Sequence, residues 1–292
     1  MALRPPPAER SVEQLLAFGV VNLDKPPGPS AHQVSAWVRD LAGVERAAHS
    51  GTLDPKVTGC LPVLTGAATR AARAFDDARK GYVAVLELHG PAPASLEATV
   101  AEFETELLQR PPRKSAVRRR LRTRTVHRLE VLDRRDRKVL LRVDCDAGTY
   151  VRKLCHDLGL ALGTGAQMGD LRRVASGTFD DRDLVTMQEL VDALAFYREN
   201  GDEAPVREVV QPAERALEGL GRVTIARSAA EQVAEGAPVY APGVLAVDVG
   251  TEAEEPQVAC YTPDGSAVCL GPLVGDPDAD RGVVVATDRV LV

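Results

Sequence analysis

The sequence is poor in aromatic residues, lysine and cysteine, and it has no long hydrophobic segment. Aromatic residues make up 4% of the 292 residues, and only six of the 36 basic residues are lysines. No apolar run approaches the ~20 residues of a membrane-spanning helix. The Pro-rich start, residues 1–10, lacks the apolar core of a signal peptide. We therefore expect a cytoplasmic protein whose first residues form a loose arm.

The cysteines and histidines do not form a recognisable metal or disulfide pattern. An odd number of cysteines without closely spaced pairs argues against a disulfide framework and against a zinc site. The histidines show no H-x-x-x-H or H-E-x-x-H spacing, so no metal site is expected. We interpret the cysteines as buried thiols in a reducing compartment. They are Cys60, Cys145, Cys155, Cys260 and Cys269.

The charge is unevenly distributed along the chain. The net charge is -6, yet residues 222–292 hold four Lys/Arg against eleven Asp/Glu, and residues 1–221 hold 32 against 31. Few lysines and an acidic surface favour a salt-rich cytoplasm, where repulsion between like charges is screened.

One segment, residues 107–129, carries nine basic residues and no acidic one. Such a tract in an acidic protein predicts contact with an RNA backbone rather than a merely solvated surface. It contains no aromatic residue, so it would follow phosphates rather than stack on bases. The residues that we expect to contact RNA here are Arg110, Arg113, Lys114, Arg118, Arg119 and Arg120.

The hydrophobic pattern predicts alternating helices and strands up to about residue 218. Strands are expected at 19–23, 82–88, 126–132, 138–146 and 171–179, and helices at 11–17, 30–43, 65–78, 148–162 and from 95 and 186 onward. Ser30 with Gln33 and Thr186 with Glu189 form capping boxes. Trp37 is expected in the core, and the run 82–88 is typical of a strand buried on both faces.

Short strands dominate beyond the Gly-Leu-Gly segment at 219–221. They are expected at 223–226, 244–249, 258–261, 267–270 and 282–286, interrupted by one helix capped by Ser228 with Glu231. This spacing, with Pro/Gly turns, predicts a small β-barrel. We therefore place a domain boundary between residues 220 and 221, after an N-terminal arm at 1–18 and a larger domain at 19–220.

The loop that contains Asp54 is the strongest candidate for a reactive site. Gly51 and Gly59 permit backbone angles closed to other residues, and Pro55 fixes its own. A residue before proline is pushed out of helix, so Asp54 is expected in an extended or turn conformation. By itself this pattern is also that of a surface Asx-type turn.

Two other polar residues, Tyr82 and Arg152, likewise stand at the edges of apolar segments. If the fold brings them to Asp54, the arginine would fix the carboxylate through forked hydrogen bonds. The tyrosine ring would offer a stacking surface for a base, at about 1–3 kcal/mol per base. Periodicity alone does not bring the three together, because they are far apart in the chain.

Four motifs in order decide the interpretation. They are NLDKP at 22–26, GTLDP at 51–55 with Thr58-Gly59 and Leu61, KGYV at 80–83, and GTYVR at 148–152. Together they resemble the pseudouridine synthases that include the bacterial tRNA T-loop enzyme and the dyskerin-type enzymes. The resemblance runs from about residue 20 to the end of the chain.

Further motifs resemble the archaeal and eukaryotic dyskerin (H/ACA) branch more than the bacterial one. They are KVTGC at 56–60, QRPP at 109–112 followed by Ala116-Val117, and LRRV at 171–174 with Ser176-Gly177. The segments 237–239 and 241–245 resemble the signature of a C-terminal PUA barrel. The resemblance implies an α+β fold: a catalytic domain around a curved, mostly antiparallel sheet at 19–220, then an RNA-binding PUA barrel at 221–292.

The resemblance also implies roles for individual residues. Asp54 would be the nucleophile that frees uracil from its ribose, with Arg152 paired to it; whether it attacks ribose or base stays open. Tyr82 would stack on the flipped uracil and assist deprotonation of carbon 5. His49 would hold the opened RNA, and Lys25 would support the loop. An ionised carboxylate suits covalent catalysis without a metal or cofactor.

The expected function is therefore RNA-guided isomerisation of uridine to pseudouridine in rRNA, as the catalytic subunit of an archaeal H/ACA ribonucleoprotein. The expected partners are a guide RNA, target rRNA or tRNA, and small accessory proteins. One alternative is a stand-alone enzyme that modifies the T-loop uridine of tRNA. Another is a non-catalytic RNA-binding scaffold, against which the intact set of Asp54, Tyr82 and Arg152 speaks.

Overall fold

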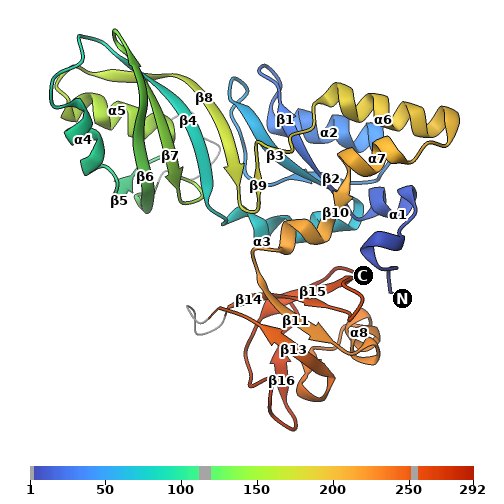
Figure 1. The fold of residues 1–292 in the computed structure, drawn as a ribbon. Helices are drawn as coiled ribbons and strands as arrows, with labels where there is room; N and C mark the ends of the chain where they lie inside the picture. The colour runs from blue at the N-terminus through green and yellow to red at the C-terminus, as the bar shows by residue number, and fades with distance from the viewer. Residues whose placement is uncertain (1–2, 112–119, 251–255) are drawn as a thin grey trace.

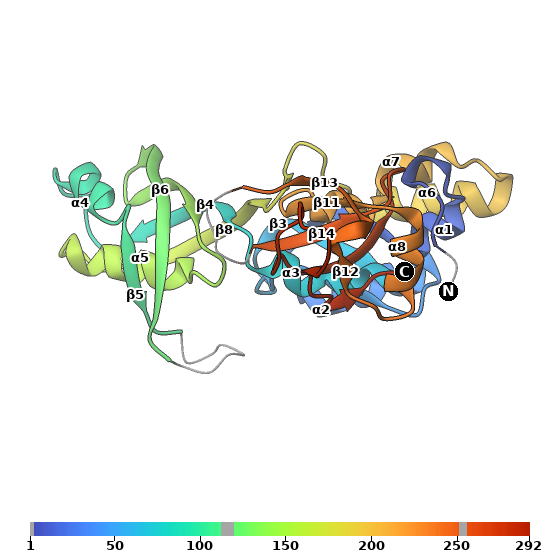
Figure 2. The same cartoon turned by 90° about the horizontal axis from the view of Figure 1, so that it is seen from below.

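The computed structural model describes residues 3–111, 120–250 and 256–292 (Figure 1). Within them the chain forms an α+β unit built on one large sheet, followed by a smaller β-rich unit. The smaller unit packs under the half of the large sheet that contains β1–β3, away from the half that contains β4–β8 (Figures 1 and 2).

The large sheet has ten strands among the described residues, in the order β10-β1-β3-β8-β4-β7-β6-β5, with β2 beside β3 and β9 beside β8. The strands are β1 (Gly19–Lys25), β2 (Ala47–His49), β3 (Thr58–Thr65), β4 (Lys80–Leu88), β5 (Glu106–Gln109), β6 (Arg122–Arg135), β7 (Lys138–Cys145), β8 (Ala166–Ser176), β9 (Phe179–Asp180) and β10 (Gln211–Pro212). β3 and β8 run parallel, and the other neighbours in this sheet are antiparallel.

The parallel contact between β3 and β8 is a short seam. Only two ladder pairs, Thr58 with Arg172 and Gly59 with Arg173, join these strands. By contrast, β4 pairs with β8 from Lys80 to Leu88. The two halves of the sheet are therefore joined at one narrow place, beside the loop that precedes β3.

Helices cover both halves of the sheet. They are α1 (Val12–Ala17), α2 (Ala31–Ala42), α3 (Ala72–Asp76), α4 (Leu96–Glu102), α5 (Val151–Ala161), α6 (Met187–Asn200) and α7 (Ala204–Val209), with 3-10 turns η1 (Pro7–Glu9), η2 (Gly66–Ala71) and η3 (Ala213–Leu217). The expected capping boxes at Ser30 and Thr186 are confirmed, and Gly43 and Gly201 end their helices in the left-handed conformation.

The smaller unit contains a five-stranded sheet in the order β13-β11-β14-β15-β17 and a two-stranded ribbon, β12-β16. Its elements are β11 (Gly221–Ile225), α8 (Arg227–Ala234), β12 (Val239–Tyr240), η4 (Ala241–Gly243), β13 (Val244–Asp248), β14 (Gln257–Tyr261), β15 (Ala267–Pro272), β16 (Val283–Val285) and β17 (Arg289–Val290). In the described residues the five-stranded ladder ends at β13 and β17. A single bridge between Leu273 and Val285 connects the ribbon to it.

The expectation of a loose N-terminal arm is wrong for the residues described. The guanidinium of Arg10 is fully buried and forms a forked ion pair with Glu214, at 2.8 and 2.7 Å. Arg4 donates 2.7 Å to the carbonyl of Leu291, and Ser266 donates 2.9 Å to the carbonyl of Pro5. The arm therefore ties the two units together, because its arginines find acceptors in both.

Other local expectations are also corrected. Trp37 is 44% exposed, because α2 buries the face formed by Ala31, Val34, Ser35 and Val38 instead. From residue 83 on, β4 alternates between buried and half-buried positions, so it is not buried on both faces. Ser228 does not cap a helix: α8 begins one residue earlier, with Ala226 at the cap. β8 spans Ala166–Ser176, so it begins five residues before the strand expected at 171–179.

Candidate active site

The structure brings Asp54 and Arg152 together although they are 98 positions apart. Asp54 lies in the loop between β2 and β3, and Arg152 is the second residue of α5. Arg152 Nη2 forms an ion pair with Asp54 Oδ2, and the two side chains are 45% and 51% exposed. The carboxylate is therefore oriented by the arginine while it stays accessible to a large substrate.

Tyr82 belongs to the hydrophobic core that also contains Leu53 and Val151, the sequence neighbours of Asp54 and Arg152. It lies on β4, is 9% exposed, and stands directly across from Arg173 of β8. Burial raises the pKa of the Tyr82 hydroxyl, and the hydrogen-bonded, positively charged Arg173 opposes that rise. The hydroxyl group is thus held in an apolar surrounding beside one fixed cation.

Lys25, at the end of β1, holds the loop that follows Asp54. Its side chain is fully buried, and Nζ donates to the carbonyls of Pro26, Pro55 and Val57 at 2.9, 3.0 and 2.9 Å. Burial lowers the pKa of this amine. Two of its acceptors, the carbonyls of Pro55 and Val57, flank Lys56, so Lys25 fixes the backbone directly after Asp54.

Arg173 holds the part of the loop that precedes Asp54. It is 1% exposed, and its guanidinium donates to the carbonyls of Cys60, Gly51 and Ser50 at 2.7, 3.1 and 3.3 Å. Arg173 is not among the site residues predicted from the sequence, where it occurs only within LRRV. The signal that could have found it is a basic pair between the apolar residues Leu171 and Val174 of an expected strand.

The glycines of the loop are required by close backbone approach. Gly59 has φ of +97°, and a Cβ there would lie 2.1 Å from the carbonyl oxygen of Arg173. Gly51 has φ of +69°, and a Cβ there would lie 3.0 Å from Arg173 Nη1. Any other residue would push β3 and the loop away from β8.

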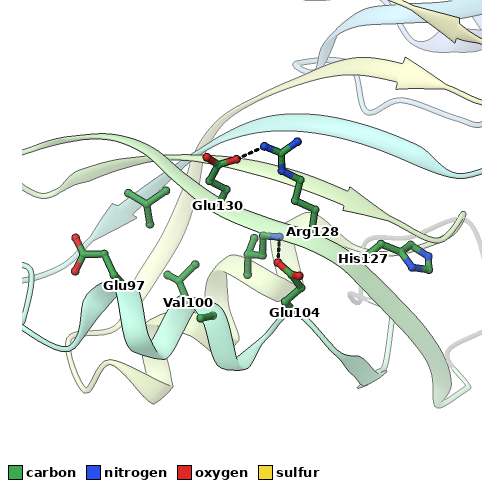
Figure 3. Close-up of a pocket in the computed structure, with 9 residues that line it drawn as sticks. Glu97, Val100, Glu104, His127, Arg128 and Glu130 are labelled. Atoms are coloured by element: carbon green, nitrogen blue, oxygen red, sulfur yellow. Dashed lines mark hydrogen bonds and ion pairs between the residues drawn. The ribbon is translucent and has the colours of Figure 1, made fainter.

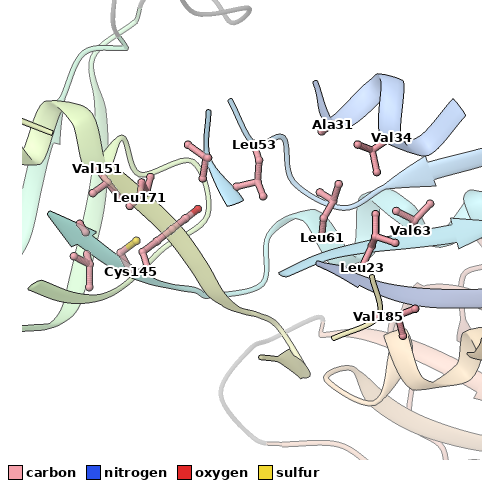
Figure 4. Packing of buried hydrophobic residues seen from close by; sticks show 14 of the residues in the cluster. Leu23, Ala31, Val34, Leu53, Leu61, Val63, Cys145, Val151, Leu171 and Val185 are labelled. Carbon is pink, nitrogen blue, oxygen red and sulfur yellow. The ribbon is translucent and has the colours of Figure 1, made fainter. Parts of the chain in front are cut away.

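Leu53 anchors the loop next to Asp54. It is 4% exposed and belongs to the large hydrophobic core. Figure 4 shows it between the side chains of Val151 and Leu171 on one side of the seam and Leu61 on the other. Since the next residue is the exposed Asp54, the packing of Leu53 fixes the position of the Asp54 carboxylate relative to the core.

His49 ends β2 and faces His32 at the start of α2. The ring centroids are 4.8 Å apart with the rings nearly perpendicular, and His49 Nε2 lies 3.5 Å from His32 Nδ1. Burial, His32 and Arg173 together lower the pKa of His49 to about 4. The imidazole is therefore neutral at neutral pH.

Of the residues in the basic tract that were predicted to contact RNA, the structure describes two, and both are exposed. Arg110 and Arg120 are exposed, one after β5 and the other before β6. Arg113, Lys114, Arg118 and Arg119 lie outside the described residues.

A groove of about 660 Å³ lies elsewhere, between α4 and β6 (Figure 3). Its lining includes Glu97, Glu104 and Glu130 against Arg128 and His127. Three carboxylates repel phosphates, so this groove is poorly suited to an RNA backbone. Neither α4 nor β6 carries Asp54, Tyr82 or Arg152.

The described residues contain neither a metal-binding cluster nor a membrane-spanning helix. None of them forms a group of three or more His, Cys, Asp or Glu that could hold a metal ion. No described helix is long and apolar enough to cross a membrane.

Comparison with known proteins identifies the family. Residues 39–95 match the TruB family pseudouridylate synthase N-terminal domain, and residues 152–218 match the tRNA pseudouridylate synthase B C-terminal domain. A relative from Haloarcula marismortui, a probable tRNA pseudouridine synthase B, is 65% identical over 100% of this chain and 94% of its own. The chain belongs to the TruB family of pseudouridylate synthases. The sequence-based prediction of an RNA-modifying isomerase is thereby confirmed.

Further matches cover the two ends of this TruB-family chain. Residues 5–35 match the DKCLD (NUC011) domain, and residues 221–291 match the PUA domain. A relative from Pyrococcus furiosus, also a probable tRNA pseudouridine synthase B, is 44% identical over 98% of this chain and 86% of its own. The resemblance to the dyskerin-type branch predicted from the sequence is confirmed.

Solved structures of high similarity are found as well. A chain in a crystal structure of a Cbf5–Nop10–Gar1 complex is 44% identical, with a TM-score of 0.93 over 99% of this chain and 90% of its own. A chain in the structure of an H/ACA RNP bound to a substrate RNA containing 2′-deoxyuridine is 41% identical, with a TM-score of 0.91 over the same shares.

Proposed function

We propose that this protein is the catalytic subunit of an archaeal H/ACA ribonucleoprotein that isomerises uridine to pseudouridine in rRNA under the direction of a guide RNA. The observation that carries the enzymatic part is the exposed Asp54–Arg152 ion pair, on a loop held by Arg173, which stands opposite the buried Tyr82. Support for guide dependence is the likeness, over 99% of the chain, to chains of H/ACA complexes.

In the proposed reaction Asp54 attacks the nucleotide, at ribose or base, and the bond between uracil N1 and C1′ breaks. The freed uracil turns and forms a new bond from C5 to C1′, and the bond to Asp54 breaks so that the carboxylate is restored. C5 then loses its proton, while N1 ends protonated. Arg152 orients the carboxylate for this covalent catalysis. Tyr82 stacks on the flipped uracil and assists removal of the C5 proton.

The remaining residues act on the RNA and on the loop. His49, neutral because burial lowers its pKa to about 4, fits an apolar and hydrogen-bonding role against unpaired bases. Lys25 supports the Asp54 loop through its three carbonyl acceptors. Arg110 and Arg120, with Arg113, Lys114, Arg118 and Arg119 outside the described residues, contact the phosphate backbone.

The proposal divides the chain into an arm at 1–18, a catalytic domain at 19–220 and an RNA-binding PUA barrel at 221–292. The acidic C-terminal unit contacts RNA locally, at a groove of about 860 Å³ that it forms with the catalytic domain. This groove is lined by four arginines against Asp77 and Asp288, which gives it a positive balance. The arginines are Arg70, Arg73, Arg79 and Arg289.

Within this proposal the protein is cytoplasmic and works with guide RNA, target RNA and small accessory proteins. The solved relatives occur in complexes named for Cbf5, Nop10 and Gar1. Small proteins of this kind would complete the particle formed by this chain, and base pairing by the guide would select the uridine.

Release of tritium from RNA labelled at uracil C5 tests the proposal. Wild-type protein with guide RNA and accessory proteins is expected to release tritium, and Asp54→Asn is expected to release none. Release by Asp54→Asn at the wild-type rate would refute the role of Asp54. Equal rates with and without guide RNA would refute guide dependence.

A second candidate function is stand-alone modification of tRNA. It is favoured by the names of the curated relatives, which are probable tRNA pseudouridine synthases. The same assay on unmodified tRNA without guide RNA separates the two: full activity there supports the stand-alone enzyme.

A further inference from the structure

Arg173 occupies an unusual place in the large sheet. It lies on β8, the strand between β3 and β4, and it belongs to one of the two ladder pairs of the seam. Its neighbour Arg172 forms a forked ion pair with Asp24 of β1, at 2.9 and 3.0 Å. Successive residues of a strand point to opposite faces, so the two arginines span the seam on opposite sides.

Arg173 reaches both groups that the proposed reaction needs. Toward β3 its three donors hold the carbonyls of Ser50, Gly51 and Cys60, which fixes the loop leading to Asp54. Toward β4 it stands opposite Tyr82, and its charge and donors lower the pKa of the tyrosine hydroxyl against the effect of burial. Directly opposite residues of an antiparallel pair share one face of the sheet.

The fork of an arginine is suited to this task and a lysine is not. The planar guanidinium presents five N–H groups in a rigid arrangement, whereas an ammonium is a point charge on a flexible stem. Buried donors of Arg173 fix acceptors in β3 and in the loop before Asp54 at once. Removing them leaves carbonyl groups unsatisfied in the core, beside the loop that carries the carboxylate.

We propose that Arg173 is a positioning residue for pseudouridine formation, which holds the Asp54 loop and the Tyr82 hydroxyl at a fixed separation and stabilises negative charge on the tyrosine oxygen. This inference rests on the proposed function. The phenolate takes the proton from C5, and the electrons of the C5–H bond form the C5–C6 double bond while those of the C6–N1 double bond move to N1, which gains a proton. The phenol then loses its proton to solvent, which restores the phenolate.

The electrostatic surroundings of Tyr82 agree with this role. The titratable and charged groups that face it are Arg173 of β8, Cys145 of β7 and Cys60 of β3. Burial raises the pKa of both thiols to about 12, so they are neutral. Arg173 is therefore the charged group among these neighbours.

The test compares Arg173→Gln and Arg173→Lys with wild type in the complete particle with guide RNA, by tritium release from C5. Both variants are expected to lower kcat about a hundredfold, the size typical of a misplacement of about 1 Å, with RNA binding unchanged. In Arg173→Gln the rise of kcat with pH is expected to extend to higher pH than in wild type, because the charge that favours the phenolate is gone. The pH profile of Arg173→Lys, which keeps a charge, is expected to lie between those of wild type and Arg173→Gln.

Arg172→Gln is the matched control, since it breaks a cross-seam contact on the opposite face of the same strand. It is expected to lower the melting temperature and to keep the wild-type pH profile. In a Tyr82→Phe background, Arg173→Gln should no longer shift the profile. The inference is overturned if Arg172→Gln reduces kcat as much as Arg173→Gln, or if the profile of Arg173→Gln equals that of wild type. An inactive wild-type particle would instead count against the proposed function itself.

Discussion

Buried cations stabilise two regions of this molecule in different ways. At the seam, Lys25 and Arg173 each donate to three neutral backbone carbonyls around the Asp54 loop. At the junction of the two units, Arg10 is paired with the carboxylate of Glu214, which also accepts from the backbone N–H of Ala267 at 3.1 Å. The positive charges of Lys25 and Arg173 are thus not neutralised by these contacts and remain available to attract the Asp54 carboxylate and the RNA. At the junction, the charge of Arg10 is neutralised by Glu214.

The difference indicates separate tasks. A buried cation facing carbonyl groups has its donors satisfied but its field uncompensated, so it acts on nearby anions. In a forked ion pair the two opposite charges largely cancel each other's field, so the pair mainly fixes geometry. Substitutions of the buried seam cations Lys25 and Arg173 should therefore change catalysis, and substitutions at the junction should change stability.

The largest effect is expected at Lys25. Lys25→Met removes the donor for the carbonyls of Pro26, Pro55 and Val57, so the loop after Asp54 loses its support. We expect kcat for tritium release to fall about a hundredfold. Lys56→Met, at an exposed position in the same loop, is the control and should stay near wild type. Equal kcat values for Lys25→Met and Lys56→Met would show that the buried seam cation does not act on catalysis, which would contradict the difference drawn between seam and junction.

The next effect is expected at the junction. Glu214→Gln leaves the Arg10 charge buried without its partner, which should lower the free energy of unfolding by about 3 kcal/mol. The kcat of the folded protein should not change. Chemical denaturation and tritium release measure the two quantities. The double variant Arg10→Met with Glu214→Leu should recover much of the stability; a loss of kcat in the folded single variant would show that the junction also serves catalysis.

A smaller effect is expected in the arginine-lined groove between the two units. Arg73→Ala and Arg79→Ala should each weaken guide RNA binding and reduce the slope of log K against log salt by about one. Binding titrations at several salt concentrations measure this slope. Arg135→Ala, at the end of β6, is the control. Slopes that match wild type would show that the junction lacks an RNA contact.

The smallest effect concerns His49. Its pKa is lowered from 6.5 to about 4, so the unfolded chain binds more protons between these values than the folded one. Stability is therefore fully present above pH 6.5 and is lost as pH falls toward 4. His49→Phe should flatten this dependence in denaturation curves, whereas His156→Phe, at an exposed position of α5, should not. An unchanged curve for His49→Phe would contradict the assignment.

Much of the local structure could be predicted because it depends on neighbours in the chain. The capping boxes at Ser30 and Thr186 use side chains three residues apart, and both were predicted correctly. Trp37 was placed wrongly, because helical spacing shows which residues share a face but not how far the neighbouring elements extend over it. The extent of β8 was missed because its pairing with β4 outweighs the local preference of Gly169 for a turn.

The candidate site divides in the same way. The sequence alone determined which chemical groups are present, and the motifs around Asp54, Tyr82 and Arg152 identified the reaction class. The glycines and prolines of the loop predicted a stiff turn. Only the tertiary structure decided that Asp54 meets Arg152, that Arg173 joins the loop to Tyr82, and that the N-terminal arm closes on Glu214. These contacts connect residues 98, 122 and 204 positions apart. The contacts of Arg173 and Arg10 form because burying a cation requires acceptors in the fold, wherever along the chain those acceptors arise.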